Sequence, residues 1–275
     1  MIAKSLIVIL LVLTFLLILL GGVVHGTGSS LACPDWPLCY GSLFPQMRGA
    51  VAIEHSHRLT ATTVGLLTVS LAVLLWKSNK LRWWGIGAVV LVLVQGLLGG
   101  ITVLFKLPTL VSTAHLATSM LFFSLLVMIA IKIFRDAAQP LNPHPLLTLT
   151  LLLTYLQIVL GALVRHSGAG LVCPEIPFCY GSIWPEAAIT RLHMTHRIGG
   201  LVVIGLIFTT TKFQWNRVSR SGRLGLVTVC LLVLGQIGLG VLSVETLLGL
   251  PAVTAHLAVA TLLLGSLVSL WGGTG

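Results

Sequence analysis

Charge is scarce in this sequence of 275 residues. Only six residues are Asp or Glu, and charged residues of both signs make up 8% of the chain. Soluble globular domains carry about a quarter of their residues as charged side chains, so an ordinary soluble domain is excluded. Hydrophobic residues instead make up 56%, and the mean hydropathy is +1.06. The missing charge therefore predicts that most of the chain lies in lipid.

The hydrophobic residues form eight long runs. In hydrocarbon every backbone N–H and C=O must be satisfied within the chain, so an apolar run of about 20 residues is expected to be a helix. The runs lie at about 5–24, 53–76, 83–104, 111–133, 146–164, 191–213, 224–244 and 251–272. The first run lacks a clear small-residue cleavage site, which favours a retained helix over a signal peptide. We therefore predict an all-α integral membrane protein with eight transmembrane helices.

The sequence carries a net charge of +10, and the positions of its basic residues indicate the topology in the membrane. The basic residues form no stripe with interleaved aromatics, so we expect no nucleic-acid binding. Ten of the sixteen Lys and Arg residues fall on one side of an eight-helix path, which the positive-inside rule makes cytoplasmic. These residues are Lys4, Lys77, Lys80, Arg82, Lys132, Arg135, Lys212, Arg217, Arg220 and Arg223. We expect a multi-pass protein of the inner (cytoplasmic) membrane, in contact with lipid, with both termini in the cytoplasm.

The sequence contains an internal repeat of one four-helix unit. CPDWPLCYGSLFP at 33–45 returns as CPEIPFCYGSIWP at 173–185, an offset of 140 residues, and the same offset within one residue pairs Gln95 with Gln236. Each half holds four helices, an even number, so the repeat is parallel. We predict two pseudo-twofold-related four-helix bundles, residues 1–139 and 140–275. The proline-rich stretch 136–145 is expected to be a non-helical linker between them.

Four histidines occupy repeat-related places near the outer starts of the even-numbered helices. They are His57, His115, His196 and His256. A single histidine at such a place is more often an interfacial residue with a satisfied ring, but four matching ones favour ligands. A closed zinc site wants three or four converging ligands, whereas each half offers one pair across a bundle. Two imidazoles suit the axial positions of haem iron, so we predict bis-histidine haem sites towards the outer face.

Three arginines stand near these histidines. Arg58 and Arg197 directly follow two of them, and Arg165 is expected in an outer loop of the second half. Guanidinium groups pair well with carboxylates, so all three are candidates to bind haem propionates. The alternative is that each arginine simply extends to the membrane interface.

The two halves differ beside the first histidine of each. Glu54 lies three residues before His57, on the same helix face, whereas His193 holds the equivalent place before His196. A carboxyl group beside a haem ligand is a candidate proton acceptor or stabiliser of a cationic intermediate. An interfacial carboxylate favoured by the helix dipole is the alternative. The asymmetry favours a reaction site in the first half and a redox cofactor in the second, with His55 on another face as a non-ligand.

Four of the five cysteines form two closely spaced pairs in the outer loops, Cys33 with Cys39 and Cys173 with Cys179. In an oxidising compartment such pairs persist as disulfides, and each would hold its loop as a lid over a haem. Thiol exchange is the alternative, but the C-x-x-C spacing that lowers a thiol pKa is missing. The remaining Cys230 is expected to be a packing residue.

Together these features resemble the haem A synthase family of bacterial and mitochondrial inner membranes. The resemblance covers essentially the whole chain, including Glu54-x-x-His57-Arg58 and His196-Arg197. It implies oxidation of the C8 methyl group of haem O to the formyl group of haem A by successive hydroxylations. It also implies a haem b between His196 and His256, and substrate haem O near His57 and His115 with Glu54 assisting catalysis.

The sequence departs from the family at His25, where an arginine is expected and where the second half has Arg165. The resemblance implies a haem O synthase as donor and terminal oxidases as users of the product. A non-enzymatic haem carrier and a di-haem b-type electron-transfer protein are the alternatives, and neither has a use for Glu54. The electron acceptor, the oxygen source and a homo-oligomeric state stay open.

Overall fold

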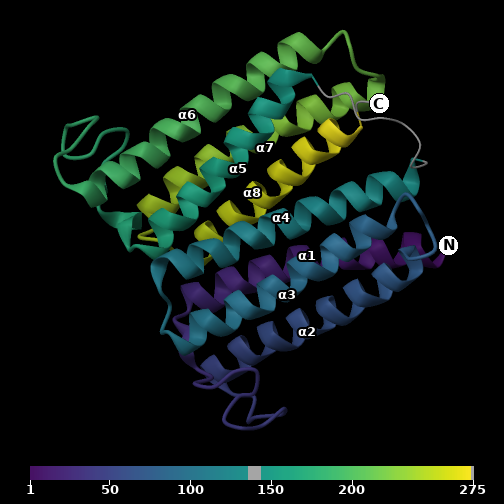
Figure 1. The fold of residues 1–275 in the computed structure, drawn as a ribbon. Coiled ribbons are helices and arrows are strands. Elements are labelled where there is room, and N and C mark those ends of the chain that lie inside the picture. The colour runs from purple at the N-terminus through teal and green to yellow at the C-terminus, as the bar shows by residue number, and fades with distance from the viewer. Residues whose placement is uncertain (136–143, 274–275) are drawn as a thin grey trace. The chain divides into compact units, whose positions relative to one another are not determined.

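The computed structural model describes residues 1–135 and 144–273. Within these residues it has no β-strand and eight helices that are long and apolar enough to cross a membrane (Figure 1). They are α1 (Ile2–Gly26), α2 (Gly49–Leu75), α3 (Arg82–Leu104), α4 (Thr109–Phe134), α5 (Pro145–His166), α6 (Ala188–Gln214), α7 (Arg220–Glu245) and α8 (Leu250–Gly272). The prediction of an all-α, eight-helix membrane protein is confirmed, with helix ends only a few residues from those expected.

The helices form two compact units, Met1–Gln139 and Pro140–Gly275. In the first unit α1 packs on α2, α2 on α3, α3 on α4, and α4 returns to α1. The second unit repeats this order with α5, α6, α7 and α8. Each unit is therefore a closed four-helix bundle in which the second and fourth helices stand at diagonally opposite corners. The pseudo-twofold relation between the units stays a prediction.

The apolar core fills one end of each bundle. In the first bundle it is built from the beginning of α1 and the later parts of α2 and α4, with Ile7, Leu71 and Ile129 among its fully buried residues. In the second bundle it joins the start of α5 to the later part of α6, for example through Leu147 and Ile207. The opposite end of each bundle, next to the disulfide loop, is the end from which the four histidines come.

Two local expectations were wrong. Pro145 was placed in the linker but begins α5, because a proline at the first helical position lacks only an N–H that needs no helical partner there. His144 caps this helix by accepting a hydrogen bond from the N–H of Leu146 at 3.2 Å. Arg165 was expected in a loop but lies in the last turn of α5. The rest of the expected linker, 136–143, falls outside the described residues.

Candidate functional site

The structure brings the four predicted histidines together in two pairs. In the first bundle His57 of α2 and His115 of α4 come from opposite corners, and their rings are close enough to interact electrostatically. In the second bundle His196 of α6 and His256 of α8 do the same. Each bundle therefore holds one pair of imidazoles at the end that carries its disulfide loop.

Each histidine ring lies against a glycine on the preceding helix, an arrangement we call a glycine seat. If a Cβ atom were added to these glycines, it would lie 2.8–3.4 Å from the ring Cε1. The seats are Gly21 for His57 (3.2 Å), Gly99 for His115 (3.4 Å), Gly161 for His196 (2.8 Å) and Gly240 for His256 (3.3 Å). Carbon atoms pack at about 3.5–4.0 Å, so a larger residue would displace the ring. The sequence analysis missed these seats, although the glycines obey the same repeat offset.

The histidine pairs fit the haem groups that the resemblance implies. The buried Nδ1 atoms of His57, His115 and His256 have no hydrogen-bond partner among the described residues, although buried polar atoms normally have one. Two imidazoles from opposite corners of a bundle would suffice to hold a haem iron, whereas a protein-held zinc ion needs three or four ligands. The donor set therefore suits one haem in each bundle.

Glu54 and Arg58 tie α2 to the first disulfide loop. The buried carboxylate of Glu54 accepts hydrogen bonds from the N–H of Cys33 at 2.8 Å and from Arg58 at 2.5 Å. Arg58 also donates to the carbonyl oxygens of Cys33 (3.1 Å), Asp35 (2.6 Å) and Leu38 (2.5 Å). The guanidinium thus holds the loop in place, and its contact with a haem propionate stays a prediction.

Arg197 holds the second disulfide loop in the same way, but has no carboxylate partner within residues 1–135 and 144–273. It donates to the carbonyl oxygens of Cys173 (2.5 Å), Glu175 (2.6 Å) and Phe178 (3.1 Å). The place equivalent to Glu54 is taken by the buried His193. Because this loop is held without a carboxylate, holding the loop does not explain why the first bundle contains Glu54.

Three glutamines contact the histidines. Gln95 donates to the backbone carbonyl of His115 at 2.9 Å, and Gln236 lies 3.2 Å from the ring Nε2 of His256. The repeat had paired these two glutamines without assigning them a role. A third, Gln157, contacts His196 from α5. The sequence analysis did not identify this residue, because it has no polar counterpart in the first half.

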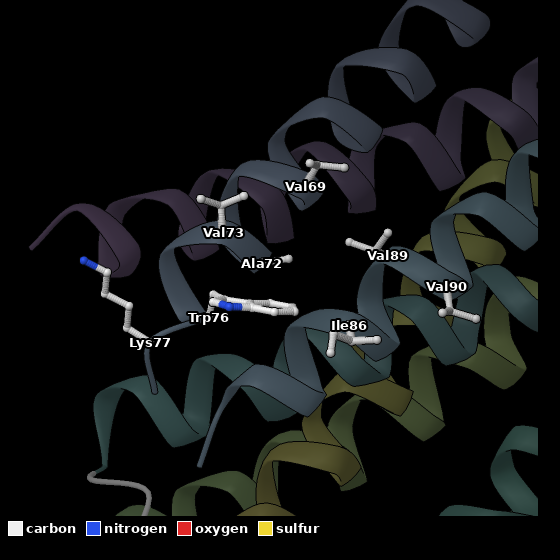
Figure 2. Close-up of a pocket in the computed structure, with 8 residues that line it drawn as sticks. All are labelled: Val69, Ala72, Val73, Trp76, Lys77, Ile86, Val89 and Val90. Carbon is white, nitrogen blue, oxygen red and sulfur yellow. The ribbon is translucent and has the colours of Figure 1, made fainter. Parts of the chain in front are cut away.

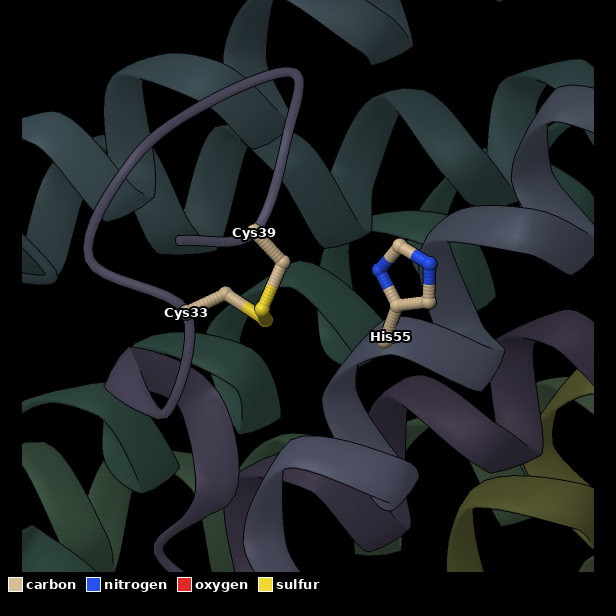
Figure 3. A group of neighbouring side chains, drawn as sticks. All are labelled: Cys33, Cys39 and His55. Atoms are coloured by element: carbon tan, nitrogen blue, oxygen red, sulfur yellow. A yellow bond between two sulfur atoms is a disulfide. The ribbon is translucent and has the colours of Figure 1, made fainter. Parts of the chain in front are cut away.

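Both cysteine pairs are disulfides, as predicted. Figure 3 shows His55 beside the bond between Cys33 and Cys39. The ligand atoms of these three residues lie within 4.8 Å of one another, but the two sulfur atoms are bonded to each other and are not the thiolates that a metal needs. The Nε2 atom of His55 lies 2.9 Å from the carbonyl oxygen of Leu43, so this ring interacts with the loop.

The structure also places Arg165, His25 and Cys230, the other residues that the sequence analysis singled out. Arg165, in the last turn of α5, lies close enough to His256 for their charges to interact. His25 lies at the equivalent position in the last turn of α1. The thiol of Cys230 lies 3.3 Å from the hydroxyl of Thr211 and packs beside the core of the second bundle. The propionate contact of Arg165 stays a prediction.

A groove between α2 and α3 lies away from the histidines. Figure 2 shows its lining near the end of α2, where Trp76 closes one side of it and Val69 and Val90 lie farther along. His57 lies near the opposite end of α2. This apolar groove is therefore not part of the histidine sites.

The fold and the paired imidazoles define a multi-pass membrane protein built from two four-helix bundles, each with a histidine pair beside a disulfide loop. Residues 4–52 and 47–268 match the sequence model of the family Cytochrome oxidase assembly protein, COX15-CtaA. The chain belongs to this family.

Proteins named "Heme A synthase" resemble the chain over most of its length. The protein of Bacillus pumilus (strain SAFR-032) is 31% identical, with 92% of this chain and 89% of that protein covered. The protein of Shouchella clausii (strain KSM-K16) is 30% identical, covering 84% and 83%. That of Bacillus licheniformis is 27% identical, covering 94% and 92%. The resemblance drawn from the motifs is thereby confirmed.

Proposed function

We propose that this protein is a haem A synthase, a membrane oxidoreductase that oxidises the C8 methyl group of haem O to a formyl group by successive hydroxylations. The family and the names of the relatives support a role in haem A synthesis. The observation that carries the enzymatic reading is Glu54, a buried carboxylate of the first bundle whose place in the second bundle is taken by His193.

The first bundle is the proposed reaction site. Substrate haem O lies between His57 and His115, with Glu54 one helical turn from His57 on the same face. If water supplies the oxygen, each hydroxylation releases protons and passes electrons to the acceptor, so a base is needed near the reacting group. Two hydrogen bonds, from the N–H of Cys33 and from Arg58, hold the Glu54 carboxylate in one orientation for that task.

The second bundle is the proposed cofactor site. His196 and His256 would hold haem b, which would supply electron transfer. Arg165 is proposed to hold a propionate at this end of the bundle, and Arg58 and Arg197 to keep both disulfide loops in place. The equal histidine pairs by themselves would also suit a di-haem electron-transfer protein, which gives no use to the lone carboxylate.

We place the two disulfide loops and the histidine sites towards the outer face of the inner membrane, with both termini in the cytoplasm. The support is the excess of Lys and Arg in the loops at the other ends of the helices. A haem O synthase in the same membrane is the proposed donor of substrate. An electron acceptor is required and is not identified, and a homo-oligomer is compatible with the proposal.

The test is conversion of haem O in membranes that contain a haem O synthase and no other source of haem A. Extracted haems are separated by chromatography for the parent chain, Glu54→Gln and, as a matched control, Glu186→Gln in an exposed outer loop. We expect haem A from the parent and the control. Because general bases contribute about 10²–10⁴-fold to rate, Glu54→Gln should leave haem O or a partly oxidised intermediate.

Two results would count against the proposal. Haem O left unchanged by the parent chain would favour a haem carrier or a cytochrome. Full conversion by Glu54→Gln would remove Glu54 from the chemistry. The haem b content of Glu54→Gln should equal that of the parent, which separates a catalytic defect from a folding defect.

A further inference from the structure

The groove between α2 and α3 of the first bundle is large enough to hold a ligand. Its volume is about 410 Å³, and small-molecule sites usually have about 300–1,000 Å³. Val69 and Ala72 of α2 and Val90 of α3 lie along it, and Trp76 closes one end beside Lys77 (Figure 2). The part of the groove nearer to the histidines is therefore lined by apolar side chains.

Two glycines continue this groove towards the histidine pair. Gly65 stands four residues before Val69 on α2, and Gly96 stands seven residues after Val89 on α3, so each shares the helix face that lines the groove. A Cβ atom added to either glycine would meet no atom of the described residues within 4 Å. We call the groove and the open places at these two glycines the α2–α3 seam.

The two glycines do not serve close packing of the helices. Small residues between membrane helices normally let the backbones approach each other. Gly85 does this, because a Cβ atom there would lie 3.1 Å from the Cα of Ala72. Gly65 and Gly96 instead border open space, so helix packing does not explain them.

The second bundle has larger side chains along the same line. Ile204, Ile237 and Phe208 stand at the positions of Gly65, Gly96 and Val69. Ile204 packs against the apolar core of its bundle. Thr211 and Cys230 stand at the positions of Ala72 and Val89, and their side chains lie 3.3 Å apart across the two helices. The open seam is therefore a feature in which the first bundle differs from the second.

The length of the seam suits the side chain by which haem O differs from haem b. This tail is a hydroxyethyl group that carries three isoprene units, with about 13 chain bonds that each advance about 1.2 Å, so it spans about 16 Å when extended. At about 1.5 Å per residue, Gly65 lies about 12 Å from His57 along α2, and Ala72 about 22 Å. A tail that starts at the edge of a macrocycle beside His57 therefore passes Gly65 and reaches the groove.

A fixed tail would also orient the substrate. The macrocycle of haem has several methyl groups, and rotation about the axis through the iron exchanges their positions. A tail held along one seam allows only one rotation, and the same methyl group is then presented to Glu54 in every turnover. Orientation of this kind lowers the barrier of a reaction because the reacting groups are already aligned.

We propose that the α2–α3 seam, from Gly96 and Gly65 to the groove that ends at Trp76, binds the isoprenoid tail of haem O. The seam selects the prenylated substrate and orients its macrocycle in the first bundle. This inference rests on the proposed function, because it takes haem O as the substrate of that bundle. The chain of a membrane lipid is the other possible occupant, and the test separates the two.

The test compares the binding of haem O with that of haem b, which has a vinyl group in place of the tail. The full-length protein carries His256→Ala, so that only the first bundle keeps its histidine pair. Titration of each haem, followed by Soret absorbance, gives its dissociation constant. Gly65→Ile and Gly96→Ile copy the second bundle. Each should weaken binding of haem O by about 5- to 150-fold, the range for overpacking, and leave binding of haem b unchanged.

Gly205→Ile on α6 is the matched control. It makes the same exchange at a glycine where an added Cβ atom also meets no described atom within 4 Å. Gly205 stands at the position of Leu66, which is 66% exposed, so it faces away from the helix pair. The control should bind both haems with parental affinity. Unchanged binding of haem b in Gly65→Ile shows that the fold and the histidine pair are intact.

Three results would count against the inference. Parental affinity for haem O in both glycine variants would overturn it and leave the groove to a membrane lipid. Equal weakening of haem O and haem b would overturn it as well, because the substitutions would then act on the macrocycle. Failure of the His256→Ala protein to bind either haem would overturn the ligand assignment of the proposed function, and this inference with it.

Discussion

The tightest glycine seat offers a direct test of how the ligand rings are positioned. A Cβ atom on Gly161 would lie 2.8 Å from Cε1 of His196. Because carbon atoms pack at about 3.5–4.0 Å, the ring in Gly161→Ala has to move by about 0.7–1.2 Å. Ligand constellations tolerate displacements of only about 0.5 Å. We therefore expect Gly161→Ala to lose haem b from the second bundle.

The size of the loss follows from overpacking. Overpacking costs about 1–3 kcal/mol, which corresponds to about 5- to 150-fold weaker binding if the haem-bound ring cannot move aside. Alanine also gains about 1 kcal/mol over glycine in helix propensity, but the helix is present with and without haem, so this gain cancels from the binding energy. Gly99→Ala, with a contact of 3.4 Å to His115, should have the mildest effect of the four seats.

The assay is the ratio of haem to protein after purification, read from the pyridine haemochrome spectrum. Gly205→Ala on α6 is the control, because a Cβ at that position meets no atom within 4 Å. It should keep full haem content and gain slightly in stability. Parental haem content and spectrum in Gly161→Ala, or a larger loss in Gly99→Ala than in Gly161→Ala, would refute the reasoning.

Two further predictions concern the first disulfide loop. A Cβ on Gly100 would lie 2.8 Å from the ring of Trp36, so Gly100→Val should displace the loop and raise the rate of hydrogen exchange of its backbone amides. The second bundle has Val241 and Ile176 at the equivalent positions. The double variant Gly100→Val with Trp36→Ile should therefore restore protection from exchange. Backbone hydrogen bonds, first that from Gly41, hold the pKa of Asp35 below its usual 3.8. The Asp35 carboxylate should therefore stabilise the loop fully above pH 3.8, and this stabilisation should be lost as the pH falls through the lowered pKa. An NMR titration of Asp35 checks the pKa, and Asp35→Asn should abolish the pH dependence of loop stability.

Several features were predictable because they depend on local pattern. A run of about 20 apolar residues has to become a helix in lipid, since its backbone groups find no other partners there. The two disulfides were predictable from spacing and from the side of the membrane on which the cysteines fall. The repeat was visible directly, and it singled out Glu54 as the position where the halves differ.

Other features depend on which side chains meet across helices, and no pattern along the chain contains that information. Arg58 follows a predicted ligand, which made it a candidate for a propionate, and the structure adds that its planar guanidinium meets the carbonyl groups of the loop that folds back over α2. Gln157 lies 39 residues from His196 in sequence and contacts it only because α5 and α6 pack together.

The sequence alone determined that this protein lies in lipid, that it has eight helices and an internal repeat, and which histidines are candidate ligands, because hydrophobicity, backbone hydrogen bonding and residue chemistry act locally. Only the tertiary structure decided how those residues are held. The close approach of each ring to a glycine and the contact of Gln157 with His196 arise from helix packing, in which every contact distance depends on both partners at once.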